Sequence, residues 1–446
     1  KTMNIVKEEL QNQAMLLKIT VTEADYGEAV NKTLKDYRKK ANVPGFRPGM
    51  VPMGIINKMY KKRVTAEESY REASKACMNY LQENKIEILG EPMPSETQPE
   101  LDFDNATEFE FHFELGLAPE VNVDLSKVKI TKYNIPVEDK MREGYKENYL
   151  RRFGKLVDVE EATSDEALSG TLEQEGKTIE KAYVGLIGMS EEERKPFIGK
   201  KKGDKIEVDV NELYKQPSQR AAILSVKEEE LEGIDPKFTF TIEQIQKFQN
   251  PEMNEEFFKQ AFPSGDVTTE EQFDSMIEKQ IERDLERETD YKFIDDTKKA
   301  VIEAAKLALP VPFLKNWLYA INEGKFTKEA IDKDFSQFEE MMSWDILKRH
   351  FAGEAKTEVS PEEAKQEAKA LAAQQFAYYG MPNVEENMLE NYASSILGNK
   401  EEARKIYDRL AERKVVDYIA GKAKVTNKKI TAEAFGKLIN PVPEAE

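Results

Sequence analysis

With 446 residues, the chain is too long for one hydrophobic core, so we expect two to four domains. Hydrophobic residues make up 39% of it and charged residues 34%, a balance typical of a globular chain with much solvated helix surface. Its one cysteine, Cys77, excludes an internal disulfide framework and fits a reducing compartment. We see no secretory signal over Lys1–Leu10 and no apolar run long enough to span a membrane.

The net charge of −19 argues against nucleic acid as the partner of the whole surface. The charge is uneven, because the segment from Lys32 to Arg63 has ten basic residues and a single acid, Asp36, for a local charge of +9. This pattern indicates one localised contact with a polyanion, although a solvated basic helix face without a partner explains it equally well. The basic residues are Lys32, Lys35, Arg38, Lys39, Lys40, Arg47, Lys58, Lys61, Lys62 and Arg63.

The N-terminal part has an α+β pattern. Strand-forming residues over 15–21 precede a helical pattern that starts at residue 22 or 23 and ends at Val43-Pro44-Gly45, since the residue before a proline leaves the helical region. Two further helices are predicted, over 51–63 and about 65–84. Cys77 lies on the apolar face of the second of these, which indicates a small core residue rather than a nucleophile.

A strand follows over 108–116, where alternation places Phe109, Phe111, Phe113 and Leu115 on one face. His112 points the other way and has no metal-ligating residue nearby, so we expect it at the surface. An extended run over 128–135 and a polar helix over 136–152 come next.

The region from about 156 to 248 is punctuated by glycine and strand-like, which predicts a compact β-rich module. Strands are expected over 167–173, 178–186, 204–210, 222–229 and 238–248. From residue 250 onward the pattern is almost wholly helical and acidic, with helices at about 269–306, from Pro312 through Trp317, and at about 328–352, 360–379, 384–397 and 400–420.

Several kinds of chemistry lack the residues they need. Two histidines, His112 and His350, and one cysteine cannot build a zinc site of the usual nitrogen and sulfur kind or a histidine-based triad. Neither GxxxxGK[ST] nor GxGxxG occurs, so nucleotide binding has no motif to support it. We therefore expect no metal and no cofactor.

The segment from Val43 to Pro52, VPGFRPGMVP, differs from its surroundings; we refer to it as the 43–52 loop. Its two glycines allow unusual backbone angles, and its three prolines stiffen the path. Phe46 and Arg47 stand at its apex, where an aromatic ring and a forked guanidinium suit a surface made of RNA and protein. The alternative is a tight structural turn with Phe46 tucked inside.

This loop resembles a known motif. Gly45-Phe46-Arg47-Pro48-Gly49, followed by Val51-Pro52, is similar to the Gly-Phe-Arg-x-Gly-Lys-x-Pro ribosome-docking loop of trigger factors. The surroundings are similar too, in MGIINKMY over 53–60, in Gly90-Glu-Pro-Met-Pro94 and in FEFHFELGLAP over 109–119. The resemblance covers nearly the whole chain in order.

The resemblance implies a multidomain α+β chain with four parts. These are an α+β ribosome-binding domain over 1–117, a linker over 118–152 that packs with the C-terminal domain, an FKBP-like prolyl isomerase insert over 153–248 and an elongated all-α chaperone domain over 249–446. It implies an ATP-independent chaperone in the cytoplasm of a bacterium. The implied partners are the ribosome, through a protein at the exit tunnel and rRNA, and nascent or unfolded polypeptides, with a homodimer when the chain is off the ribosome.

For docking, the resemblance assigns Gly45, Phe46, Arg47, Pro48 and Gly49 to the contact. Two positions depart from the family, because Pro48 and Met50 stand where lysines are usual. We therefore expect weaker or differently salt-dependent docking, with charge supplied by flanking residues. Those flanking residues are Lys39, Lys40, Lys58, Lys61 and Lys62.

For the insert, the resemblance implies an apolar, aromatic-lined pocket for a prolyl ring, to which Tyr183, Phe197 and Tyr214 are assigned. The usual Val-Ile-Pro-Gly-like pocket segment is missing, and residues 189–197 stand near its place. We expect weak or no isomerase activity. One alternative function is a prolyl isomerase whose helices only hold substrate, and another is a periplasmic chaperone of similar helical build.

For client binding, two groups of aromatic and methionine residues in the helical part are candidates, because such side chains adapt to varied apolar partners. The alternative for each is ordinary helix core. The first group is Phe335, Phe338, Met341, Met342 and Trp344, and the second is Phe376, Tyr378, Tyr379 and Met381.

Overall fold

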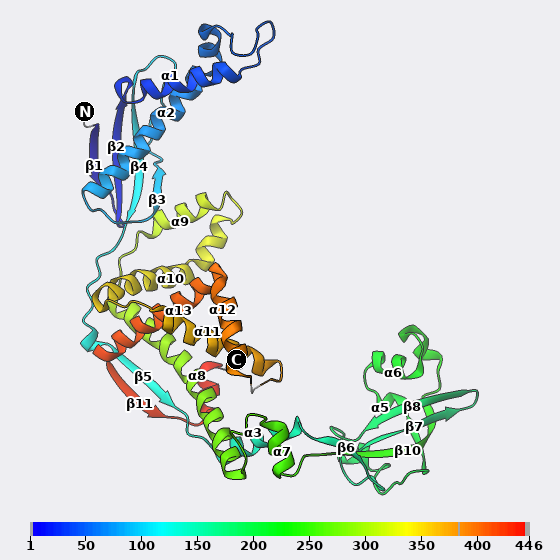
Figure 1. Cartoon of the computed structure of the whole chain (residues 1–446). Helices are drawn as coiled ribbons and strands as arrows, with labels where there is room; N and C mark the ends of the chain where they lie inside the picture. Colours follow the sequence, from blue (N-terminus) through cyan, green and yellow to red (C-terminus); the bar gives the residue numbers. More distant parts are fainter. Residues whose placement is uncertain (1–2, 382–383, 442–446) are drawn as a thin grey trace. The chain divides into compact units, whose positions relative to one another are not determined.

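A computed structural model of the chain describes residues 3–381 and 384–441 (Figure 1). The chain divides into two compact units. One consists of the residues up to Tyr133 together with Asp290–Lys428, and the other of Asn134–Thr289 together with the residues from Lys429 onward. In the described residues, no helix is long and apolar enough to cross a membrane.

The first unit begins with an antiparallel sheet in the order β1-β2-β4-β3, against which two helices pack (Figure 1). Phe109, Phe111 and Phe113 of β4 are buried on one face, as alternation predicts, and Phe113 lies opposite Leu17 of β2. Their core is completed by helix residues such as Leu34. The expected α+β architecture is thus confirmed. The elements are β1 (Asn4–Glu9), β2 (Ala14–Thr22), α1 (Glu23–Lys40), α2 (Met53–Glu83), β3 (Ile88–Pro94) and β4 (Glu108–Leu117).

The helix α2 is longer than the sequence predicts. Two helices are expected, over 51–63 and about 65–84, whereas the structure has one continuous helix. Val64 and Thr65 stand at the expected junction, and both are buried. After Gly54 the helix contains no glycine or proline, so nothing in the sequence interrupts it.

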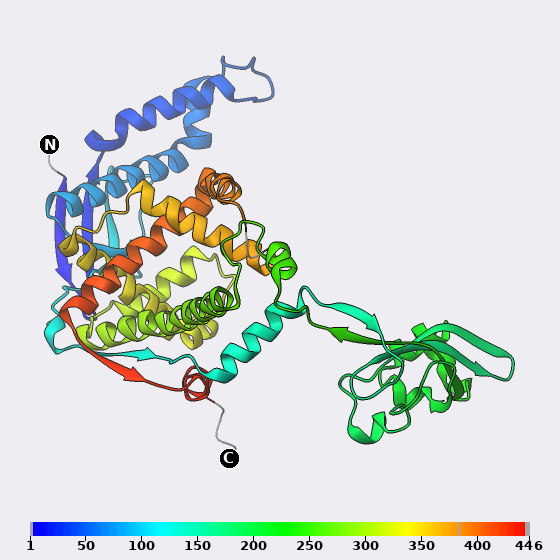
Figure 2. The same cartoon turned by 60° about the horizontal axis from the view of Figure 1, so that its bottom comes forward.

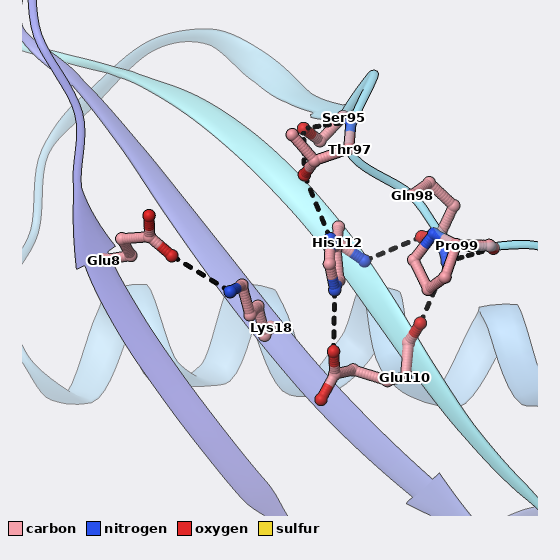
Figure 3. Close-up of polar contacts among 8 residues, drawn as sticks. All are labelled: Glu8, Lys18, Ser95, Thr97, Gln98, Pro99, Glu110 and His112. Atoms are coloured by element: carbon pink, nitrogen blue, oxygen red, sulfur yellow. Dashed lines mark hydrogen bonds and ion pairs between the residues drawn. The ribbon is translucent and has the colours of Figure 1, made fainter.

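Two expectations about single side chains in this unit have opposite outcomes. Cys77 lies in the core, as its spacing predicts, and burial raises the pKa of its thiol to about 11. For His112 the prediction of a surface residue is wrong, because only 8% of it is exposed. Its Nδ1 lies 3.1 Å from the Thr97 hydroxyl, and its Nε2 lies 2.7 Å from a carboxylate oxygen of Glu110 (Figure 3). The Gln98 side chain also accepts a hydrogen bond from the backbone amide of His112. The segment that follows β3 therefore covers His112, which strand alternation alone predicts to be exposed.

The β-rich insert lies in the second unit and forms a five-stranded antiparallel sheet (Figure 2). The strand order is β6-β10-β7-β8. The remaining strand, β9, pairs with the N-terminal part of β10, whereas β6 pairs with its C-terminal part. Alternate residues Phe238, Phe240 and Ile242 of β10 are fully buried and form the centre of its core. The strands are β6 (Lys155–Asp158), β7 (Ala167–Gln174), β8 (Lys177–Gly185), β9 (Lys205–Asp209) and β10 (Lys237–Gln249), and the short helices are α4 (Glu191–Arg194) and α5 (Val210–Leu213).

One predicted strand of the insert is wrong. The segment 222–229 contains the end of α6 (Pro217–Leu224) and the start of the 3-10 helix η2 (Glu228–Gly233). Pro217 occupies the first turn of α6, where its fixed φ favours a helix, and Ser225 ends the helix in a left-handed conformation with φ of 54°. These end signals outweigh the short apolar run that predicts a strand.

The rest of the second unit packs around aromatic rings. Tyr149 stacks on Phe262 with ring centroids 5.6 Å apart and meets Phe273 edge-on at 5.5 Å. The Nη2 of Arg142 donates to Glu278 at 2.9 Å across the two long helices of this cluster. Its helices are α3 (Asp139–Arg151), α7 (Glu255–Ala261) and the first part of α8 (Glu270–Ala305), and α14 (Ala432–Ile439) belongs to the same unit.

Helices make up most of the remainder of the first unit, which confirms the helical C-terminal region. Ser360 caps α11 by accepting from the Glu363 amide, and Pro361 takes the first helical position. Fully buried Ala364 and Ala393 allow α11 and α12 to approach closely. The helices are α9 (Val311–Ile321), α10 (Lys328–Ala355), α11 (Pro361–Tyr378), α12 (Glu386–Gly398) and α13 (Lys400–Lys422).

A two-stranded ribbon accompanies these helices (Figure 2). The strand β5 (Lys129–Asn134) follows a 3-10 turn, η1 (Leu125–Lys127), and pairs with β11 (Lys424–Lys429). Ile130 packs into the helical core with Phe293, so one face of the ribbon is covered. The extended run expected over 128–135 is therefore present.

Candidate docking loop and apolar surfaces

The 43–52 loop between α1 and α2 consists of two consecutive β-turns. The amide of Phe46 donates to the carbonyl of Val43 at 3.1 Å, and the amide of Met50 donates to that of Arg47 at 2.9 Å. Each turn has proline in second place and glycine in third, and the glycine φ is +89° in the first turn and +82° in the second. Proline followed by a glycine of positive φ is the pattern of a type II turn. The loop therefore repeats one proline-fixed turn twice.

Local backbone geometry, rather than packing, sets the shape of this loop. No other atom lies within 4 Å of the Cβ position of Gly45 or Gly49 beyond their chain neighbours. Phe46 is 38% exposed and Met50 66%, and Arg47 is exposed as well. The ring of Phe46 is thus available at the surface and is not tucked into the core.

The two helices hold the end of the loop in place. Val51 is fully buried, and Nε of Arg38 donates to its carbonyl at 2.9 Å. The rings of Tyr37 and Tyr60 meet edge-on with centroids 5.2 Å apart, which joins α1 to α2 just behind the loop. A pair of fixed turns on a fixed base presents Phe46 and Arg47 in a defined orientation.

Cationic side chains surround the loop, but not all of them are free to bind a partner. Lys39 pairs with Asp36 at 2.9 Å, and this hydrogen bond lowers the pKa of the Asp36 carboxyl. Lys62 pairs with Asp104, and Arg63 pairs with a neighbouring glutamate. Within the described residues, the basic side chains of this region that form no ion pair are Lys32, Lys35, Arg38, Lys40, Arg47, Lys58 and Lys61. Of the two flanking lysines that precede the loop, Lys39 forms an ion pair with Asp36, whereas Lys40 forms none but also lowers the pKa of Asp36 through its charge.

In the insert, the structure brings two of the three assigned pocket residues together. The hydroxyl of Tyr214 donates to the carbonyl of Tyr183 at 2.6 Å, and burial raises the pKa of Tyr214 to about 12. The Tyr183 ring is 57% exposed. Phe197 is 2% exposed and belongs to the core of the insert, so it offers almost no surface to a ligand.

The first assigned client group is mostly helix core. Phe335 is 5% exposed and its ring lies 5.6 Å from that of Phe338, in a cluster that also holds Met342 and residues of α9. Trp344 is buried in a neighbouring cluster, and its indole N–H donates to a carboxylate of α13 at 2.7 Å. Only Met341, at 58%, is well exposed.

The second assigned client group is mostly exposed. Phe376 is half-buried against Tyr392, with centroids 5.2 Å apart. Beyond it, Tyr378 is 86% exposed, Tyr379 68% and Met381 48%, and the two tyrosine rings meet edge-on at 5.5 Å. Tyr378, Tyr379 and Met381 form an apolar surface that we name the α11 tip.

Sequence reasoning did not identify a hollow in the first unit. This open hollow has a volume of about 1310 Å³ and is lined by the adjoining ends of β3 and β4, by the segment after β4 and by α10. Lys85 and Arg349 contribute charge, and Leu89 and Ile346 contribute apolar surface. Its lining comes from segments far apart in the chain, so no local pattern indicates it.

Comparison with known proteins covers the chain from end to end. Three family descriptions match in order: "Bacterial trigger factor protein (TF)" over residues 3–149, "Probable trigger factor, FKBP-like domain" over 156–250 and "Probable trigger factor, C-terminal domain" over 289–439.

Relatives of full length carry the same name. The trigger factor of Marinobacter nauticus is 25% identical over 97% of this chain and 98% of its own, and that of Aliivibrio salmonicida is 24% identical over 99% and 100%. The fold is similar to a solved structure described as showing promiscuous substrate recognition in the folding and assembly activities of the trigger factor chaperone. That structure is 18% identical, covers 94% of this chain and 100% of its own, and has a TM-score of 0.52. Three matching descriptions in order, together with full-length relatives of the same name, establish that this chain belongs to the trigger factor family.

Proposed function

We propose that this chain is a ribosome-associated chaperone that binds nascent polypeptides near the exit tunnel and works without ATP. The observation that carries the proposal is the 43–52 loop, whose two fixed turns expose Phe46 and Arg47 at the end of a two-helix base. Membership of the trigger factor family supports the same function. The alternative of an enzyme whose helices only hold substrate is not favoured.

Docking through this loop combines two kinds of contact. Phe46 fits an apolar pocket on a ribosomal protein, and the forked guanidinium of Arg47 pairs with a carboxylate or an rRNA phosphate. Because the turns are formed before binding, little backbone entropy is lost on docking. Lys40 adds long-range attraction, since it forms no ion pair in the described chain.

Client binding is assigned to the α11 tip, with Met341 as a further exposed apolar contact. Tyrosine and methionine side chains adapt to apolar segments of varied shape, so the same surface serves many clients. Burying an exposed client segment for a short time delays misfolding, and release allows folding to continue. No step of this cycle requires nucleotide.

We propose that the insert has weak or no prolyl isomerase activity. Tyr183 and Tyr214 lie together, but Phe197 is packed inside the core and leaves the assigned pocket with few aromatic walls. The intact chain at micromolar concentration is expected to leave the isomerisation of a proline-containing peptide at its uncatalysed time of tens to hundreds of seconds. A protease-coupled peptide assay measures the isomerisation rate. If the wild-type chain accelerates isomerisation and Tyr183→Ala does not, the proposal is contradicted.

Further parts of the proposal concern organisation. We propose domain limits at 1–117, 118–152, 153–248 and 249–446, with the linker packing on the C-terminal domain. A chaperone of nascent chains works where the ribosome works, so we place this one in the cytoplasm. We also propose that the chain forms a homodimer when it is off the ribosome. Analytical ultracentrifugation of the free chain measures its mass in solution and tests this directly.

Ribosome co-sedimentation tests the main proposal. Wild-type chain is expected to pellet with ribosomes, whereas Phe46→Ala/Arg47→Ala is expected to stay in the supernatant, because both specific contacts of the loop are gone. Equal pelleting of the two proteins would remove ribosome docking through this loop.

A further inference from the structure

The ribbon of β5 and β11 is a basic surface in an acidic chain. Residues 125–137 contain three lysines and residues 418–432 contain four, and neither segment contains an aspartate, a glutamate or an arginine. The whole chain has a net charge of −19, so this absence of acids is a strong local departure. The two segments come together in space only because β5 and β11 pair.

Hydrogen bonds at the two ends of the ribbon give its direction and register. The amide of Lys424 donates to the carbonyl of Val128 at 2.8 Å, and the amide of Ile430 donates to that of Asn134 at 3.0 Å. Both partners advance together along the chain, so the strands are parallel. In a parallel pair of strands, a residue whose amide donates to the carbonyl of residue i on the neighbouring strand lies beside residue i+1. Because Lys424 donates to Val128, Lys424 lies beside Lys129.

The covered face of the ribbon carries the apolar side chains Ile130 and Val425, and three of the ribbon's five lysines lie on the other face. Ile130 and Val425 pack into the helical core. Alternation along each strand therefore places a second set of residues on the outer face. We name this set the ribbon face, and it consists of Lys129, Thr131, Tyr133, Lys424, Thr426 and Lys428. The three lysines are all exposed.

No acid of the described residues pairs with these three lysines. In the residues that the structure describes, Lys129, Lys424 and Lys428 form no ion pair, whereas Lys127 just outside the ribbon face pairs with Asp124 at 3.5 Å. Neighbouring strands lie about 4.8 Å apart, so Lys129 and Lys424 are like charges in adjacent positions, which destabilises a sheet. An anionic partner turns this unfavourable pair into a favourable contact.

We propose that the ribbon face binds the phosphate backbone of RNA, independently of base sequence. Lysine amines and threonine hydroxyls are among the side chains that contact phosphates. The ribbon has no arginine, so its lysines act as point charges without bidentate recognition, and the closely spaced phosphates of RNA engage several of them at once. The proposal does not depend on docking through the 43–52 loop, which lies on different elements.

The test is RNA binding by the intact chain, measured through the fluorescence anisotropy of a labelled single-stranded RNA of mixed sequence at several salt concentrations. The variant Lys129→Gln/Lys424→Gln/Lys428→Gln removes three charges. It is expected to bind at least about tenfold more weakly at low salt, and the slope of log affinity against log salt is expected to fall by about 2. The matched control is Lys202→Gln/Lys205→Gln/Lys237→Gln, which removes three exposed lysines that have no ion pair in the described insert. It is expected to behave like wild type.

Each other outcome overturns the proposal. Unchanged affinity and slope in the ribbon variant mean that its lysines only protect a strand edge from pairing with other chains. Equal losses in ribbon and control variants mean that only net charge matters. A greater loss of binding to a poly-glutamate peptide than to RNA assigns the face to an acidic polypeptide. If circular dichroism shows that the triple variant is unfolded, Lys428→Gln alone is expected to lower the slope by about 0.7, and no change in it rejects the proposal.

Discussion

The 43–52 loop and the α11 tip both expose aromatic and methionine side chains, but different forces hold them in place. In the loop, two hydrogen-bonded turns and two left-handed glycines fix the backbone beneath Phe46 and Met50. At the α11 tip, Tyr378 and Tyr379 project from the last turn of a helix and make their described ring contact only with each other. The loop is a preformed surface for one partner, and the tip is an adaptable surface for many.

This difference fits the two proposed tasks. A docking contact has one partner, so a preformed shape reduces the entropy lost on binding. Client segments vary in shape, so flexible methionine and large tyrosine side chains serve them better than a fixed pocket. The rigidity of the backbone that carries an exposed aromatic side chain therefore indicates its function better than its exposure alone.

The largest expected effect separates core rings from tip rings. Phe335→Ala is expected to destabilise the helical region by about 3–5 kcal/mol, because it empties a buried ring position beside Phe338. The matched variant Tyr379→Ala removes a ring that is 68% exposed and is expected to change stability by less than about 0.5 kcal/mol. Urea unfolding followed by tryptophan fluorescence measures both, since both tryptophans lie in this region. Similar losses in the two variants would erase the distinction between core and tip.

The next effect tests whether the loop is preformed. Gly49→Ala forces a Cβ onto a residue with φ of +82°, which costs about 1–2 kcal/mol although no neighbouring atom is in the way. Ribosome affinity is expected to fall by about tenfold. Gly54→Ala, in the first turn of α2 and equally uncrowded, is the control, and it is expected to keep wild-type affinity and to raise helix stability slightly. Equal affinity of both variants would mean that the loop takes its shape only on the ribosome.

The smallest expected effect concerns charge in the same loop. Pro48→Lys/Met50→Lys restores the two cations usual in the family and is expected to steepen the slope of log ribosome affinity against log salt by about 1–2. At physiological salt the gain is partly offset, because losing Pro48 frees the second turn at a cost of about 0.4–1 kcal/mol. Affinity measured at four or more salt concentrations gives the slope. An unchanged slope would mean that positions 48 and 50 face away from the phosphates.

Local patterns predict the backbone of this molecule well and the exposure of its side chains poorly. The turns of the 43–52 loop, the helix spacing after residue 269 and the alternation in β4 all depend on neighbours in sequence, and the structure has them where expected. His112 is buried by the segment that follows β3, and Phe335 is buried by α9. Nothing near either residue in the sequence indicates this cover. The predicted strand over 222–229 failed because its apolar residues are too few to separate a strand from a short helix.

The most direct test of the account measures two activities of one variant side by side. Phe46→Ala/Arg47→Ala and wild type are compared in ribosome titration and in suppressing aggregation of an unfolded client without ribosomes. Ribosome binding is expected to be lost while suppression of aggregation is unchanged, because the α11 tip is intact. Suppression that falls in parallel with ribosome binding, or ribosome binding that stays at the wild-type level, would contradict the division of tasks between a fixed loop and an adaptable tip.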